Sequence, residues 1–290
     1  MRISNSLIQQ RTLRDLQRNL QAMTTVQQQI SSGKRFERIS EDPLGGTQVM
    51  GVDQALKGIA QYRRNSSTAR ARNDTEESVL NQVTDLLTRS KELALQEGTA
   101  TATTATHQAA AAEVDSIIQQ VIALGNTQIG TEHIFGGNQT GATPFDPTGT
   151  YLGDDGVRQA EVGQGYLLQT NHTGRQLLVN SGVLQSLQDL KTQLTSGTTS
   201  SIGSTASGID AAFQQTQVLL ADTGARTRQI DSAMQNSDAL ESNLTIRKSG
   251  IQDMAIDQAT TQFVGLQTTL QAALLSAQRV LNTSLTDYLR

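Results

Sequence analysis

The sequence predicts a mainly α-helical, elongated protein in which long helices from both chain ends pair and a small antiparallel β domain is inserted between them. Three observations support this fold class. Apolar residues recur every three or four positions near both ends, the middle is dense in glycine, and only 3% of the 290 residues are aromatic. Narrow apolar seams suit paired helices better than a compact globule with a wide core.

Amphipathic helices with coiled-coil seams are predicted at both termini. The N-terminal seam consists of Leu13, Leu16, Leu20, Met23, Val26 and Ile30. The C-terminal seam consists of Phe263, Leu266, Leu270, Ala273, Ala277, Leu281 and Leu285. We interpret both as subunit assembly seams, because stripes this thin cannot offset the entropy lost when the chain is ordered. We therefore expect largely disordered ends in the monomer, until copies or partner proteins cover their flanks.

The segment SSGKRFERISEDPLGG, residues 31–46, contains a Gly-Lys pair that hints at a phosphate-binding loop. Such a loop needs a glycine five residues before that pair and a hydroxyl after it, but Gln28 and Arg35 occupy these positions. The segment is better interpreted as a joint between helices. Ser31 to Gly33 would end one helix, and the oxygens of residues 40–42 would cap the next, with Pro43 in its first turn.

Inner helices are predicted on both sides of the middle. On the N-terminal side they cover about 52–95 and, after an interruption at Gly98 to Thr106, about 114–125. Their C-terminal partner covers about 207–243, and Ser249-Gly250 marks a second joint. The Ser/Thr/Gly tract 195–207 is expected to be a linker.

The middle of the chain, from Phe135 to Asn180, is different in kind. Short runs at 157–162 and 166–170 are flanked by Gly-Asp-Asp-Gly and Gly-Gln-Gly turn signals, which predict antiparallel strands. The expected domains are then the two halves of a terminal coiled-coil domain, two parts of an inner helical domain and a β-rich outer domain. The terminal coiled-coil domain combines 1–40 with 249–290. The inner helical domain combines 41–135 with 201–248, and the outer domain covers 136–200.

No catalytic site, cofactor site or metal site is predicted. His107, His133 and His172 lie in separate segments without the spacing of metal ligands. The neighbouring Glu132 and His133 could act as acid and base, but polar residues at a helix end explain them better. Asp154 lies in a run without the alternating acids of a calcium loop.

Charge, cysteine content and hydropathy argue against several classes of function. Residues 1–40 carry seven Lys or Arg against two acids, while the whole chain has a net charge of −4. This basic arm alternates with an apolar seam and lacks aromatic platforms, so a solvated helix face is favoured over nucleic-acid binding. We expect no membrane partner, because no apolar run approaches the length of a span, and no cleaved signal peptide. With no cysteine, the chain uses neither disulfides nor thiol chemistry.

The residues at both ends resemble the flagellin family of bacterial axial proteins. The resemblance covers roughly 1–135 and 205–290, and is carried by the spaced apolar N-terminus, the Ser-Ser-Gly-Lys-Arg turn, the Ser40 to Pro43 helix start and the C-terminal helix. The family more often has Asp where Glu41 stands. The segments 134–137, 143–145 and 151–154 resemble the hook–filament junction type within this family.

This resemblance implies a non-enzymatic structural subunit, exported unfolded through the flagellar type III apparatus to an extracellular position at the hook–filament junction. The implied partners are copies of the chain in a ring, hook-associated protein 1, flagellin and an export chaperone that holds the helix from Phe263 to Leu289. A short flagellin that forms the filament itself is the alternative within the family. A helical effector module that binds host helices is an alternative from another class, but it leaves the inserted sheet unexplained.

Overall fold

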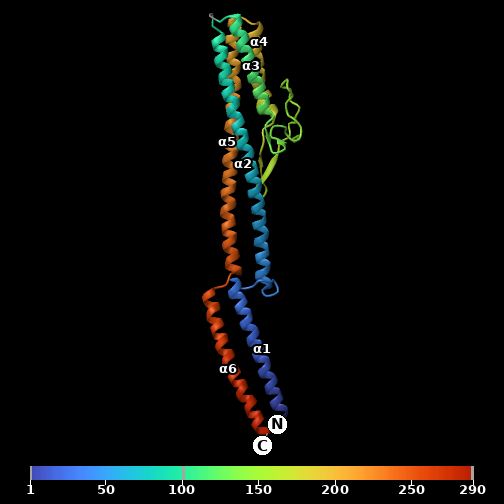
Figure 1. The fold of residues 1–290 in the computed structure, drawn as a ribbon, viewed down its shortest axis with the longest axis vertical. Helices are drawn as coiled ribbons and strands as arrows, with labels where there is room; N and C mark the ends of the chain where they lie inside the picture. The colour runs from blue at the N-terminus through green and yellow to red at the C-terminus, as the bar shows by residue number, and fades with distance from the viewer. Residues whose placement is uncertain (1, 100–101, 289–290) are drawn as a thin grey trace. The chain divides into compact units, whose positions relative to one another are not determined.

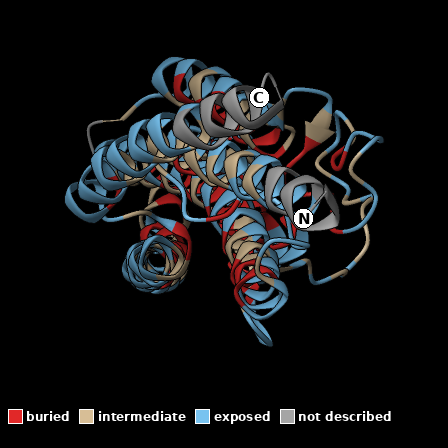
Figure 2. Cartoon of the chain, turned by 90° about the horizontal axis from the view of Figure 1, so that it is seen from below, coloured by how far each residue is buried: buried red, intermediate tan, exposed pale blue. Residues whose placement is uncertain are grey.

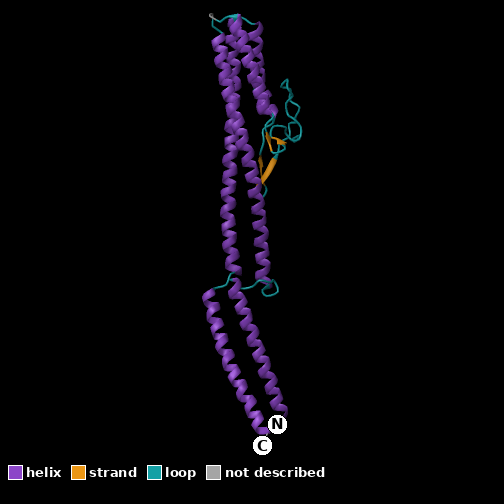
Figure 3. Cartoon of the chain, in the orientation of Figure 1, coloured by secondary structure: helices purple, strands orange, loops and turns teal. Residues whose placement is uncertain are grey.

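The computed structural model describes residues 2–99 and 102–288 and divides into two compact units. The first unit comprises Met1–Lys57 and Glu241–Arg290, and the second comprises Gly58–Leu240. Two long helices, α2 (Pro43–Glu97) and α5 (Thr199–Gln252), have residues in both units. Helices dominate the chain, and the strands are few and short (Figures 1 and 3).

The first unit contains the predicted terminal helices, α1 (Arg2–Ser32) and α6 (Ile256–Tyr288). They lie side by side and run antiparallel (Figure 1). Among the side chains that the structure describes in these two helices, only Val26 and Ala259 are buried. The helical pairing agrees with the sequence, while the side chains that the structure describes in this pair enclose very little core.

The first joint is built as the sequence predicts. Helix α1 ends at Ser32, and Gly33 follows with φ +70°, a left-handed conformation that glycine adopts without a steric penalty. Helix α2 begins at Pro43, whose missing amide costs nothing at this position. The preceding Asp42 is the cap, since its Oδ1 accepts a 2.9 Å hydrogen bond from the amide of Gly45.

Two expectations for α5 are wrong. Ser249 and Gly250 lie inside this helix, and the second joint instead occupies residues 253–255. The expected linker 195–207 is mostly helical as well, because α5 begins at Thr199. Ile202 and Ile209 are buried in the core, so tertiary packing overrides the weak helix propensity of this Ser/Thr/Gly tract.

The second unit is a helical assembly around one main core. Helix α3 (Thr104–Gly125) packs on α4 (Val183–Ser196), and buried residues of α2 and α5 complete the core. Thr103 caps α3 in a reciprocal arrangement with Thr106. Ion pairs join α2 to α5, including a 2.6 Å contact between Lys91 Nζ and Asp210 Oδ1. Buried residues gather on the inward sides of the helices, whose outer sides are exposed (Figure 2).

The strands form two antiparallel hairpins. One pairs β1 (Gln128–Ile129) with β2 (Glu132–His133), and the other pairs β3 (Gln159–Gly163) with β4 (Tyr166–Gln169). The second hairpin confirms the two strands predicted in the middle, and its turn contains Gly165 at φ +69°. Through Val162 and Leu168 it packs on α2 and α5 in a small second core.

The segment 136–200 contains more helix than the sequence suggests. After β4 the chain forms one π-helical segment, η1 (Arg175–Asn180), and then α4. Val183, Leu187, Leu190 and Leu194 of α4 are buried and recur every three or four residues. This period is the signal that could have revealed α4 within a glycine-rich region.

Candidate functional site

The predicted assembly seams occupy several different environments. On α1, Val26 is buried and Leu16, Met23 and Ile30 are half-buried. Leu13 and Leu20 are more exposed, at 60% and 47%. On α6, the half-buried residues are Phe263, Leu266, Leu270, Ala273 and Ala277. The side chains of Leu281 and Leu285 lie outside the described residues.

An exposed apolar flank remains on each terminal helix. On α1 it comprises Leu13 and Leu20, which are a heptad apart and therefore on one face, while the exposed Leu7 lies on another face. On α6 it comprises Val264, Leu274 and Leu275, which sequence reasoning missed because they fall beside the main seam. We call the five residues Leu13, Leu20, Val264, Leu274 and Leu275 the flank residues. Large apolar side chains in such rows mark surfaces that associate with other molecules.

The two helix joints of the first unit are clamped together by their backbones. The amide of Arg35 donates to the carbonyl of Gln252 at 2.7 Å, and the amide of Met254 donates to the carbonyl of Gly33 at 2.9 Å. Lys34 and Asp253 form the intervening antiparallel bridge. The clamp therefore fixes the point where α1 and α6 begin to run alongside each other.

Side chains strengthen this clamp. Gln29 donates from Nε2 to the carbonyl of Arg35 at 2.6 Å, and the Arg35 guanidinium contacts Asp42 Oδ2 at 2.8 Å. Phe36 is buried, and its ring lies under the Arg35 guanidinium at 5.5 Å. The capping residue of α2 is thus held by the same arginine whose amide reaches α5.

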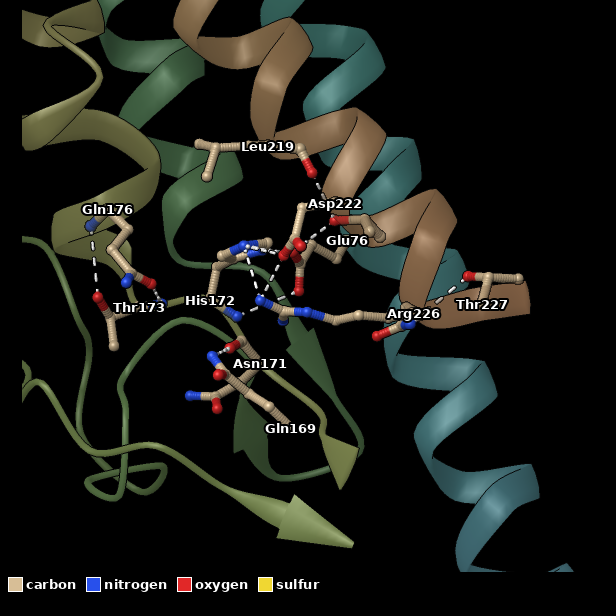
Figure 4. A network of polar contacts seen from close by, with 12 residues as sticks. Glu76, Gln169, Asn171, His172, Thr173, Gln176, Leu219, Asp222, Arg226 and Thr227 are labelled. Atoms are coloured by element: carbon tan, nitrogen blue, oxygen red, sulfur yellow. Dashed lines mark hydrogen bonds and ion pairs between the residues drawn. The ribbon is translucent and has the colours of Figure 1, made fainter. Parts of the chain in front are cut away.

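A buried polar network attaches the inserted segment to α2 and α5 in the second unit (Figure 4). His172, which follows β4, contacts Glu76 of α2 through Nδ1. Its Nε2 lies 3.0 Å from Asp222 Oδ2 and 2.9 Å from a guanidinium nitrogen of Arg226, both on α5. Thr223 Oγ1 lies 2.9 Å from Glu76 Oε1. These contacts tie the segment that follows β4 to both α2 and α5.

The other histidines serve local contacts. His107 Nε2 lies 3.1 Å from the carbonyl oxygen of Glu97, and His133 Nδ1 lies 2.9 Å from that of Asn126. Glu132 and His133 form strand β2 and do not end a helix, and the Glu132 carboxylate contacts Arg72 and Arg158. Within residues 2–99 and 102–288, no group of three His, Cys, Asp or Glu side chains is placed to hold a metal ion.

Asp154 also has a structural contact. Its Oδ1 accepts hydrogen bonds from the amides of Asn138 at 2.6 Å and Gly156 at 3.0 Å, and so fixes a turn. Over the described part of the chain, none of the helices combines the length and the apolar character that a bilayer-spanning segment requires.

The sequence is similar to those of known flagellar proteins. Residues 3–140, which include nearly all of α1 and the whole of α2 and α3, match the bacterial flagellin N-terminal helical region. Over this N-terminal part, the chain is similar to the bacterial flagellin family. The chain is 29% identical to flagellar hook-associated protein 3 of Salmonella typhimurium over 179 residues, which are 61% of this chain. A filament relative, the flagellar filament 41 kDa core protein of Borreliella burgdorferi, is 31% identical over 103 residues, 36% of this chain.

Solved structures show the same fold. A flagellar hook-associated protein from Vibrio parahaemolyticus superposes with a TM-score of 0.68 at 16% identity, over 73% of this chain and 100% of that one. By contrast, the sequence alignments span 56% of the Salmonella protein and 31% of the Borreliella protein. The chain thus matches little more than half the length of its hook-associated relative.

Proposed function

We propose that this chain is a structural subunit of the bacterial flagellum at the hook–filament junction, where it links hook-associated protein 1 on the hook to the flagellin filament. The observation that carries this choice is the extent of similarity. The match to a hook-associated protein 3 covers a much larger part of the chain than the match to a filament core protein. The proposed role is mechanical and involves no catalysis.

Neighbouring copies would assemble into a ring through the first unit. The α1–α6 pair buries Val26 and Ala259 but leaves the flank residues in water. Burial of one such leucine or valine stabilises an assembly by about 1.5 to 3 kcal/mol. A few flank residues per subunit, repeated around a ring, would supply the free energy that the α1–α6 pair lacks alone. In this proposal, the seam residues on α1 and α6 belong to a terminal coiled-coil domain through which the subunits assemble.

The domain assignment extends this proposal. Residues 1–40 and 249–290 would form the terminal coiled-coil domain, and residues 41–135 with 201–248 the helical domain. Residues 136–200 would form the inserted domain. The backbone clamp between Gly33, Arg35, Gln252 and Met254 would then hold the two terminal helices in register when a neighbour covers them.

Export would precede assembly. A chain whose ends hold little core can be threaded unfolded through the flagellar type III apparatus, and the absence of cysteine prevents crosslinks in transit. A cytoplasmic export chaperone would cover the apolar stripe of residues 263–289 until secretion. Removal of residues 251–290 should abolish chaperone binding, and full-strength binding by the truncated chain would contradict this step.

Deletion of the gene tests the junction role. Cells without a junction protein should build complete hooks and release flagellin monomer into the medium, because export continues while the filament has no seat. Antibody labelling of the chain in electron micrographs should give a single band at the distal end of the hook. Deletion cells that assemble normal filaments would contradict the proposal.

A short flagellin is the second candidate function, and the 31% identity to a filament core protein favours it. The same experiments separate the two candidates. Loss of a flagellin would leave hooks with no monomer in the medium, and the antibody would label the filament along its length.

A further inference from the structure

A pocket in the second unit lies between α2 and the β3–β4 hairpin. Its volume is about 250 Å³, enough for one small polyatomic ion. Arg72 of α2 and Arg158, which precedes β3, both line it. Thr68, Gln159 and Thr170 add polar groups to its wall. The walls come from separate parts of the chain, and the fold brings them together.

The two guanidinium groups share a single carboxylate. Arg158 Nη1 lies 3.0 Å from Glu132 Oε2, and Arg72 Nη2 contacts the same oxygen. Glu161 also lines the pocket, but its Oε1 accepts a 3.0 Å hydrogen bond from the amide of Gly165 in the hairpin turn. Two cationic groups therefore share one carboxylate oxygen, and the Glu161 carboxylate places a second negative charge in the pocket wall.

Arg72 retains unused hydrogen-bonding capacity. The residue is 9% exposed, and its Nη1 is buried without a hydrogen-bond partner among the described residues. Burial lowers the pKa of this guanidinium, and the nearby positive charge of Arg158 lowers it further. A buried, charged N–H group without a partner is unfavourable, and an oxyanion that reached it would supply the missing hydrogen bond.

We propose that this pocket binds one small oxyanion, a carboxylate or a phosphate-like ion, between the guanidinium groups of Arg72 and Arg158. Guanidinium groups offer planar, paired N–H donors that match the oxygens of both ligand types. The ligand would bridge α2 and the segment that leads into β3. Its source is either a free inorganic ion or the carboxylate of an acidic side chain. The proposal is independent of the junction role.

The test is an NMR titration of the full chain with sodium phosphate and, separately, sodium acetate, at constant ionic strength set with chloride. The readouts are the Nε–H signals of Arg72 and Arg158. Saturable shifts with phosphate alone would identify a free inorganic oxyanion as the source. Saturable shifts with acetate would identify carboxylate chemistry. The absence of saturable shifts with either probe would overturn the proposal.

Three variants make the titration specific. Arg158→Gln should weaken binding about tenfold or more, because a charge-assisted contact is lost, and this side chain is exposed enough to be replaced without disrupting the fold. Glu132→Gln should instead tighten binding, since it removes the competing carboxylate, and a purely structural role for Glu132 would not produce this gain. Arg70→Gln is the matched control, because Arg70 lies on the same helix and pairs with Asp74 and Asp231 outside the pocket. Equal affinity in all four proteins would also overturn the proposal.

Discussion

The backbone amide of Arg35 donates a 2.7 Å hydrogen bond to the carbonyl oxygen of Gln252, across 217 positions of the sequence. This bond connects the joint between α1 and α2 to the joint between α5 and α6, so the two joints are held together. The positive φ of Gly33, at the start of the first joint, turns the chain toward this contact. The conformation of each joint therefore depends on residues from the opposite end of the chain.

Gly33→Ala should loosen the clamp. An alanine at φ +70° carries a backbone penalty of about 1 to 2 kcal/mol, although no atom lies within 4 Å of the added Cβ. Amide exchange at Arg35 and Met254 should then accelerate by roughly 5- to 30-fold. Gly51→Ala is the control, since Gly51 lies within α2 with equally open space and should leave both amides unchanged. Unchanged exchange in the Gly33 variant would show that the clamp does not need this conformation.

Gly98→Ala should destabilise the second unit. A Cβ at Gly98 would lie 2.8 Å from the Cα of Gly203, a backbone contact that cannot be relieved by a side-chain movement. We expect a loss of about 1 to 3 kcal/mol in the free energy of unfolding, measured by denaturant titration. Gly203→Ala is the matched control. Its Cβ would lie at 3.8 Å from Gly98, an ordinary contact, and the change should be neutral or stabilising.

Tyr151 should make the second unit sensitive to alkali. Burial raises the pKa of its phenol from 10.0 to about 12, and Asp155 and Asp154 contribute. Between these pH values the unfolded chain releases a proton that the folded chain keeps, so stability should fall as pH rises from about 10 to about 12. Below pH 10 this group contributes no pH dependence. Tyr151→Phe should flatten this part of the stability profile, and an unchanged slope would assign the alkaline loss to other groups.

Tyr151→Phe should also lower stability at neutral pH. The phenol oxygen lies 2.7 Å from the carbonyl oxygen of Asp154 and 3.0 Å from that of Phe135. Loss of the hydrogen bond that the phenol donates to these carbonyl groups should lower the free energy of unfolding by about 1 kcal/mol, measured by denaturant titration.

The flank residues should matter to assembly and not to the isolated chain. Leu13 and Leu20 are already exposed, so the double change to alanine should leave the unfolding of the monomer within about 0.5 kcal/mol of the wild type. Attachment of filaments to hooks, counted in electron micrographs, should decrease strongly. Val218→Ala is the control, because Val218 is also exposed but lies in the second unit. Normal filament attachment in the double variant would remove the flank residues from the assembly surface.

Periodicity and capping chemistry were sufficient to predict the terminal helices, the first joint and the β3–β4 hairpin. These features depend on neighbouring residues, such as Pro43 after Asp42 or the glycines on both sides of Gln164. The second joint depends instead on distant contacts. Ser249 and Gly250 are local signals for a helix end, yet α5 continues to Gln252, where the chain meets Arg35.

The candidate sites, like the second joint, could be predicted from the sequence only in part. The seam residues follow from spacing along each helix, but spacing alone cannot decide which side of α1 faces α6. Leu13 and Leu20 therefore belong to the exposed flank although they share the seam's period. The pocket near Arg72 could not be predicted, because Arg72, Glu132 and Arg158 come from three separate parts of the chain that only the fold brings together.

Amide hydrogen exchange on the dilute, full-length monomer tests the central claim most directly, namely that α1 and α6 enclose too little core to be stable without neighbours. We expect rapid exchange throughout residues 2–30 and 258–288, alongside strong protection in α3 and α4, whose apolar faces are buried in the main core. Protection of the two terminal helices equal to that of α3 and α4 would contradict the account.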